Sequence, residues 1–120
     1  MTRGRIVRGA ALFAAAAGVS YGLILNLCHA VFACGCRSWW NGAAEQCNIH
    51  EEGVRHCPWC AYGDAGFWLA MALLLAPQAV LSFWPARWSW GIRAAAVLAA
   101  FPVAGTAVAA GYGWYAGYWR

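Results

Sequence analysis

Cysteine and histidine side chains are concentrated in one short part of this chain. Residues 34–65 hold five of the six cysteines, two of the three histidines and all four acidic residues. Within this segment two residues separate Cys47 from His50, and two residues separate Cys57 from Cys60. At this spacing a tight turn can direct both side chains to the same metal ion. The two pairs therefore predict a tetrahedral site of three thiolates and one imidazole.

The types of the ligands indicate a soft or borderline metal. Thiolates and imidazoles together favour zinc, and an iron–sulfur cluster or Cu(I) comes next. Only six residues separate the two pairs, which is short but sufficient for a knuckle-like turn. The predicted ligands are Cys47, His50, Cys57 and Cys60, with Cys34, Cys36 and His56 as further candidates.

The same cysteines support a second interpretation, thiol–disulfide chemistry. Cys57-Pro-Trp-Cys60 has the CxxC form of redox-active pairs, in which one thiolate is stabilised and the other thiol resolves a mixed disulfide. Cys34-Gly-Cys36 is a candidate second pair. The CPWC tetrapeptide resembles thioredoxin-type sites, although no βαβ pattern surrounds it. Two thiol pairs beside membrane helices also resemble membrane disulfide oxidoreductases, and Cys57 and Cys60 would then be the catalytic residues.

A third interpretation is that plain disulfides hold the loop together. With Cys28 as a sixth partner the cysteines allow fifteen connectivities. An oxidising compartment would favour disulfides over free thiols. His50 and His56 favour a metal, because disulfides gain nothing from nearby histidines. The residue pattern leaves the three interpretations open.

The elements that position these residues follow from composition. The 120-residue chain is 63% hydrophobic and only 10% charged, whereas soluble domains carry about 25% charged residues. Three apolar stretches are each long enough to span a bilayer, which takes about 20 residues. We expect a single all-α membrane domain with three transmembrane helices. The predicted spans are about 9–33, 66–84 and 92–118, with the Cys/His-rich loop at 34–65 and a short connection at 85–91.

Aromatic and small residues agree with this arrangement. None of the nine tryptophans lies in the middle of a predicted span, as expected for side chains that prefer the membrane–water interface. Gly105, Ala109, Gly113 and Gly117 recur every four residues in the third span, and such a stripe lets helix backbones approach closely. The expected partners are therefore the lipid bilayer and another helix, in this chain, in a second copy or in another protein.

Arginine placement predicts the orientation. The chain has no lysine, and five of its eight arginines lie in the N-terminal flank or the second connection. The positive-inside rule places this side in the cytoplasm and the cysteine-rich loop outside. The composition indicates a bacterial inner membrane. An alternative is that the arginine-bearing start and Val31-Phe32-Ala33 form a cleaved signal before Cys34, but the apolar stretch exceeds a signal core, so we expect a retained helix.

Several function classes are disfavoured. The apolar cores of the spans contain no Asp, Glu, Lys or Arg, which argues against a pump or a proton-coupled transporter. The scattered arginines form no nucleic-acid footprint. With so few polar groups, the chain is expected to be an accessory subunit or a metal-handling protein rather than a self-contained enzyme.

Overall fold

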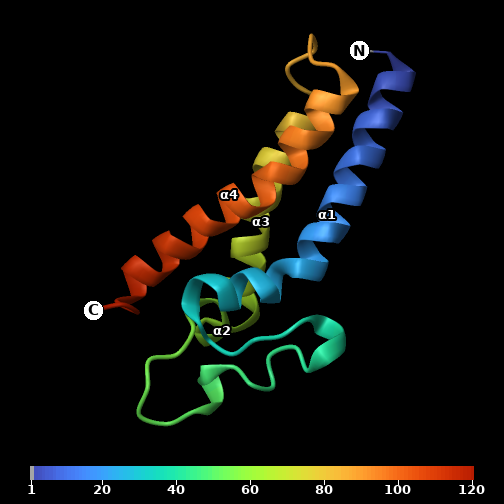
Figure 1. Cartoon of the computed structure of the whole chain (residues 1–120). Coiled ribbons are helices and arrows are strands. Elements are labelled where there is room, and N and C mark those ends of the chain that lie inside the picture. The colour runs from blue at the N-terminus through green and yellow to red at the C-terminus, as the bar shows by residue number, and fades with distance from the viewer. Residues whose placement is uncertain (1) are drawn as a thin grey trace.

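The structure is a computed structural model that describes residues 2–120 (Figure 1). Three long helices run through it: α1 (Arg3–Phe32), α3 (Gly63–Phe83) and α4 (Trp90–Ala116). The segment between α1 and α3 holds two short 3₁₀ turns, η1 (Trp39–Asn41) and η2 (Asn48–His50), and a four-residue helix, α2 (Pro58–Ala61). No strand occurs in this described part of the chain. The predicted fold class is therefore confirmed.

All three long helices are long and apolar enough to cross a membrane. α1 and α4 begin earlier than the predicted spans, because side chains cap their first turns. The Thr2 side chain accepts a hydrogen bond from the Arg5 backbone N–H, and the Ser89 side chain accepts one from that of Ile92. Such caps satisfy the free N–H groups that a helix start leaves.

Hydrogen bonds from arginine side chains connect the three long helices at the end of the bundle where the N-terminus lies. Arg5 donates a hydrogen bond of 2.9 Å to the Phe83 carbonyl oxygen. Arg93 is buried and donates to the carbonyl oxygens of Leu81, at 2.8 Å, and Pro85. These carbonyl oxygens lie at the end of α3 and in the turn after it, where the helix offers them no backbone N–H donor. Arginines on α1 and α4 therefore both cap α3.

A buried amide joins the helices near the middle of the bundle. Gln78 of α3 is fully buried, and its side-chain N–H groups donate to the Ser20 hydroxyl of α1 and the Val97 carbonyl of α4, both at 3.0 Å. In a bilayer such groups need internal partners, since lipid offers none. One side chain thus links all three spans.

The stripe of small residues on α4 packs inside the chain. Ala109 is fully buried. A Cβ added at Gly105 would lie 2.3 Å from the side chain of Leu27 on α1 and 3.1 Å from that of Leu74 on α3. The stripe therefore lies against α1 and α3, where a larger side chain at Gly105 would meet Leu27 and Leu74.

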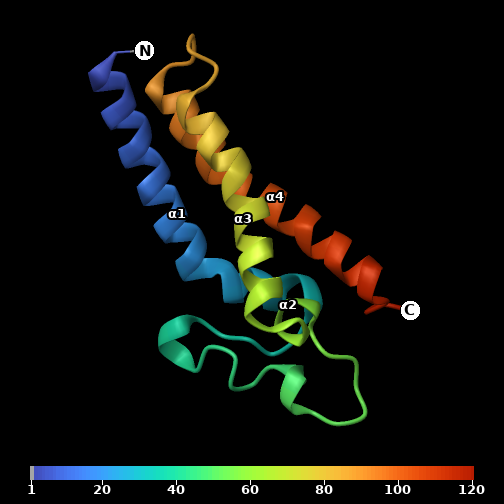
Figure 2. The same ribbon diagram turned by 180° about the vertical axis from the view of Figure 1, so that it is seen from behind.

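The segment between α1 and α3 folds across one end of the bundle, opposite the N-terminus (Figures 1 and 2). Trp39 of η1 donates a hydrogen bond of 2.7 Å to the Tyr21 carbonyl oxygen and stacks on the Tyr21 ring at 5.0 Å. Tyr118, just after α4, donates a hydrogen bond of 2.6 Å to the Phe32 carbonyl oxygen. The first contact holds the loop against α1, and the second joins the segment after α4 to the end of α1.

Candidate metal centre

All six cysteines of the chain meet beneath the helix bundle. Five of them are buried to 3% exposure or less, and Cys60 is half-buried. Their sulfurs form three overlapping groups, and within each group all sulfurs lie within 4.8 Å of one another. The groups are Cys28, Cys34 and Cys57; Cys34, Cys36 and Cys47; and Cys47, Cys57 and Cys60. The structure therefore contains a cysteine cluster able to bind metal.

The sulfur–sulfur distances describe free thiols in close contact. The Sγ atom of Cys28 lies 3.1 Å from that of Cys57 and 3.3 Å from that of Cys34, and the Sγ atoms of Cys47 and Cys60 are 3.6 Å apart. A disulfide bond is about 2.05 Å long. Two thiolates on one tetrahedral zinc lie roughly 3.8 Å apart. Small side-chain movements would thus reach either a metal-bound or a disulfide-bonded state.

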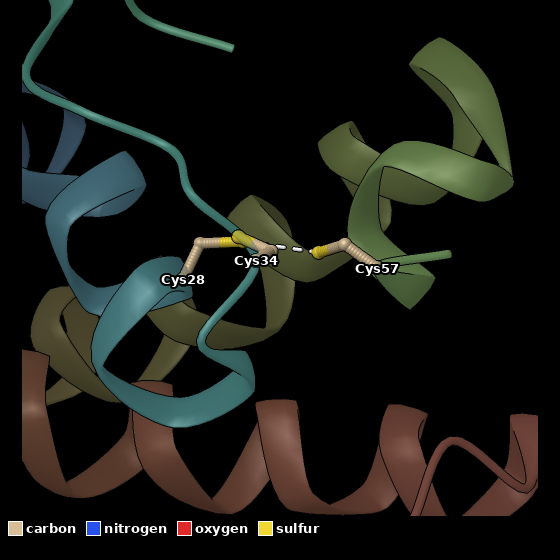
Figure 3. Close-up of side chains that lie close together, drawn as sticks. All are labelled: Cys28, Cys34 and Cys57. Carbon is tan, nitrogen blue, oxygen red and sulfur yellow. Dashed lines mark hydrogen bonds between the residues drawn. The ribbon is translucent and has the colours of Figure 1, made fainter. Parts of the chain in front are cut away.

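Three separate parts of the chain supply the first group (Figure 3). Cys28 lies in the second-last turn of α1, Cys34 in the extended segment after that helix, and Cys57 immediately before α2. The close-up shows their side chains pointing toward one another from these elements. Because α1 is a long helix packed in the bundle, the bundle fixes the position of the Cys28 sulfur.

The turn at the end of α1 brings Cys34 back under its own helix. Ala33 takes a left-handed conformation with φ of 51°, and its N–H donates to the His29 carbonyl oxygen. Gly35 follows with φ of 95°. A Cβ at Gly35 would lie 2.2 Å from the Gln46 carbonyl oxygen, because the chain passes close by at this point. Glycine is therefore required between Cys34 and Cys36.

Asn48 ties the cysteine-bearing segments to one another. Its backbone N–H donates to the Cys34 carbonyl oxygen at 2.7 Å. Its side-chain oxygen accepts a 2.7 Å hydrogen bond from the Cys57 N–H, and its side-chain N–H donates to the Tyr118 hydroxyl at 2.8 Å. One residue thus sets the spacing of two loop segments and the C-terminal segment.

A single helical turn presents the CPWC cysteines to the cluster. Cys57 precedes α2, Pro58 occupies the first helical position, and the Ala61 N–H donates to the Cys57 carbonyl oxygen at 2.8 Å. Proline suits that position, since its fixed φ matches a helix and it lacks an N–H. Trp59 is buried, with its ring edge-on to Phe32 at 5.7 Å. This contact holds the turn against α1.

The thiols strongly influence one another's ionisation. Burial raises the pKa of the Cys47 thiol to about 11, since a thiolate there loses its hydration. Hydrogen bonds from the Cys28 thiol, and then from Cys36, hold the pKa of Cys34 below its ordinary value. Closely spaced thiolates repel one another, so six cannot ionise together without a cation. A bound metal supplies that charge and deprotonates its ligands.

The structure separates the predicted ligands into two sets. Cys47, Cys57 and Cys60 lie together in one group, and Cys34 and Cys36 belong to the adjoining groups. The histidines lie outside these groups and bond to backbone. Nε2 of His50 is 3.0 Å from the Ala44 carbonyl oxygen, and Nε2 of His56 is 2.8 Å from that of Glu51, with both side chains exposed. The ligand atoms that meet are therefore all sulfur.

Comparisons with protein-family models, curated protein sequences and solved structures give no match for this chain.

Two residues of the site, Cys28 and Asn48, cannot be identified from the spacing of cysteines and histidines in the loop. Cys28 lies inside the first apolar stretch, and the sequence pattern gives it a place only as a sixth disulfide partner. The signal that identifies it is helical register: with Leu25 and Phe32 it shares the buried face of α1. Asn48 lies between Cys47 and His50, and nothing in the sequence distinguishes it from an ordinary loop residue. Its role depends on contacts with residues 9 and 70 positions away.

Proposed function

We propose that this chain is a bacterial inner-membrane protein that binds thiophilic metal ions through the cysteine cluster at its outer face. It acts as a metal-handling protein or as the metal-binding subunit of a larger membrane complex. The observation that most supports this function is that six cysteine sulfurs, from α1, the loop and α2, meet in three overlapping groups. Soft thiolate ligands select Cu(I), zinc or iron–sulfur clusters over hard cations.

The cluster is suited to metal binding because its sulfur ligands are polarisable and most of them are shielded from water. Five of its sulfurs are almost inaccessible to water, so bound metal would be protected from competing ligands. Cys60 is the half-buried member, which gives an incoming ion or a partner's thiolate one place to begin ligand exchange. A binding and transfer role follows more readily than catalysis, since five of the six cysteines are too buried to reach an organic substrate.

Metal analysis of the purified full-length protein tests this function. We expect metal to copurify with the chain in detergent under anaerobic conditions, and removal by a chelator to expose six titratable thiols. The Cys47→Ser variant should lose most of the metal. The matched control, His50→Ala, should keep it, because the His50 imidazole bonds to backbone away from the sulfurs. Protein that takes up no thiophilic metal with all six thiols reduced would refute the proposal.

The orientation is a separate part of the proposal and has its own test. Arg5 and Arg93 lie in the first turns of α1 and α4, and Arg87 lies between α3 and α4. Figure 1 shows these elements at the end of the bundle opposite the loop, and the positive-inside rule places that end in the cytoplasm. A membrane-impermeant thiol reagent should therefore label metal-stripped protein in intact spheroplasts. Labelling that requires permeabilised cells would reverse the orientation.

Thiol–disulfide exchange is the second candidate, and one observation favours it. The Cys28 and Cys57 sulfurs are 3.1 Å apart, so oxidation could join α1 to the CPWC turn. A redox-active cysteine must be accessible for attack on a mixed disulfide, and Cys57 is fully buried. Cys60 would then have to be the attacking thiol. Reversible oxidation coupled to a substrate protein, blocked by Cys60→Ser, would favour this candidate over metal binding.

A further inference from the structure

The three cysteine groups share members in a regular way. Cys34, Cys47 and Cys57 each belong to two groups, whereas Cys28, Cys36 and Cys60 each belong to one. Every group therefore consists of one unshared sulfur and two shared sulfurs. A thiolate has several lone pairs and can bridge two metal ions, so this pattern is a closed ring of three metal positions joined by three bridging sulfurs.

The number of sulfurs in each group restricts the metal. Structural zinc is almost always bound by four ligands in a tetrahedron, and iron–sulfur clusters are held by four cysteines. Each group here contains three sulfurs. Monovalent copper has a filled d shell and prefers soft thiolates, and it forms stable three-coordinate complexes with them. Divalent copper favours a square arrangement of nitrogen and oxygen ligands, which this cluster does not provide.

We infer that the cluster binds three Cu(I) ions, one in each group, with Cys34, Cys47 and Cys57 as bridging ligands and Cys28, Cys36 and Cys60 as terminal ligands. This inference rests on the proposed metal-binding function and specifies its metal and stoichiometry. Binding needs no electron transfer. Three Cu(I) ions replace six thiol protons, so three positive charges enter, six protons leave, and the copper–thiolate unit carries a charge of −3.

The surroundings of the sulfurs suit monovalent copper. Cu(I) is easily oxidised where water and oxygen reach it, and five of the six sulfurs are at most 3% exposed. Trp59 and Phe32, both 2% exposed, belong to the same buried cluster as those five cysteines. Apolar side chains beside a soft metal site limit the access of solvent. The half-buried Cys60 is a terminal ligand of one position, where copper could be exchanged.

Copper titration of the metal-free, fully reduced protein in detergent tests the arrangement. Cu(I) is added anaerobically against a chromophoric Cu(I) chelator, and bound copper is counted per chain. We expect saturation at three Cu(I), release of about six protons per chain, and X-ray absorption showing three sulfur neighbours and a nearby copper for each ion.

The variants distinguish bridging from terminal ligands. Removing a terminal sulfur affects one position, so Cys36→Ser and Cys60→Ser should each bind two Cu(I). Removing a bridging sulfur affects two positions, so Cys34→Ser should bind one. His50→Ala, the control, should bind three. Because Cys60 is half-buried, its variant should keep the fold even where a substitution at a buried position perturbs it; circular dichroism checks each variant.

The outcomes separate this inference from the function on which it rests. Saturation at one ion per chain, or equal losses in the Cys34→Ser and Cys60→Ser variants, would overturn the three-copper ring while leaving a metal-binding protein. One tightly bound zinc that Cu(I) does not displace would do the same. Failure to bind any thiophilic metal would refute the proposed function itself.

Discussion

The sulfur of Cys28, within the first spanning helix, lies 3.1 Å from the sulfur of Cys57, 29 residues later at the start of the CPWC turn. Both side chains are fully buried. This contact couples a membrane helix directly to the cysteine-rich loop. Metal bound at this point would hold the loop to the bundle, so metal affinity and protein stability should be linked.

Replacing Cys28 by serine should therefore weaken metal binding as much as replacing Cys36 or Cys60, which like Cys28 belong to one sulfur group each. The substitution is nearly isosteric, so we expect the metal-free fold to persist. Metal affinity should fall at least about tenfold, or about 1.4 kcal/mol, and the metal-induced rise in Tm should shrink. Thermal unfolding in detergent with and without metal measures both. The control is His56→Ala, which alters an exposed side chain bonded to the Glu51 carbonyl; equal behaviour of the two variants would contradict the prediction.

Replacing Gly35 by alanine should disrupt the cluster through the backbone. Its φ of 95° disfavours any side chain, and the added Cβ would lie 2.2 Å from the Gln46 carbonyl oxygen. A left-handed conformation costs a non-glycine residue about 1–2 kcal/mol, and the steric clash adds to this. We expect lower thermal stability and reduced metal content.

Gly53 provides the matched control for that substitution. Its φ is 76°, and an added Cβ there meets no atom within 4 Å. Gly53→Ala should show the conformational cost alone and retain metal. Equal metal loss in the two alanine variants would show that the close approach of Gly35 to Gln46 does not matter.

Removing the Asn48 side chain should make the loop more mobile while leaving every cysteine in place. Asn48→Ala leaves the Cys57 N–H without an acceptor and removes the hydrogen bond to the Tyr118 hydroxyl, and an unsatisfied buried group costs about 1–3 kcal/mol. Amide hydrogen exchange should become faster in residues 47–57. Tyr118→Phe removes the hydrogen bonds of this hydroxyl to Asn48 and to the Phe32 carbonyl but keeps the bond between Asn48 and the Cys57 N–H, so it should have a smaller effect in this segment. If the tyrosine variant exchanges faster there than the alanine variant, Asn48 is not the organising residue.

Enlarging Ala109 should separate the helices of the bundle. Ala109 is fully buried on the small-residue face of α4, whereas its neighbour Ala110 is exposed. Ala109→Leu should destabilise the protein by about 1–3 kcal/mol through overpacking, while Ala110→Leu should leave thermal stability in detergent nearly unchanged. Similar stability of the two variants would mean that the α4 face tolerates expansion and does not define the helix packing.

The three helices and the loop between the first two follow from the amino-acid sequence alone. Apolar stretches of about 20 residues or more have one stable form in a bilayer, because only a helix satisfies its own backbone there. This property is local, so it can be read from hydropathy without knowledge of the fold. The loop was also recognisable as the site of chemistry, since its cysteines interrupt an otherwise apolar chain.

Which side chains meet depends instead on how the whole chain folds. Spacing alone paired Cys47 with His50, yet the η2 turn carries the His50 imidazole to the Ala44 carbonyl and leaves the Cys47 sulfur near that of Cys60. Cys28 joins the cluster because Ala33 and Gly35 reverse the chain beneath α1. Those contacts depend on backbone reversals and on partners far apart along the chain, which no short spacing pattern records.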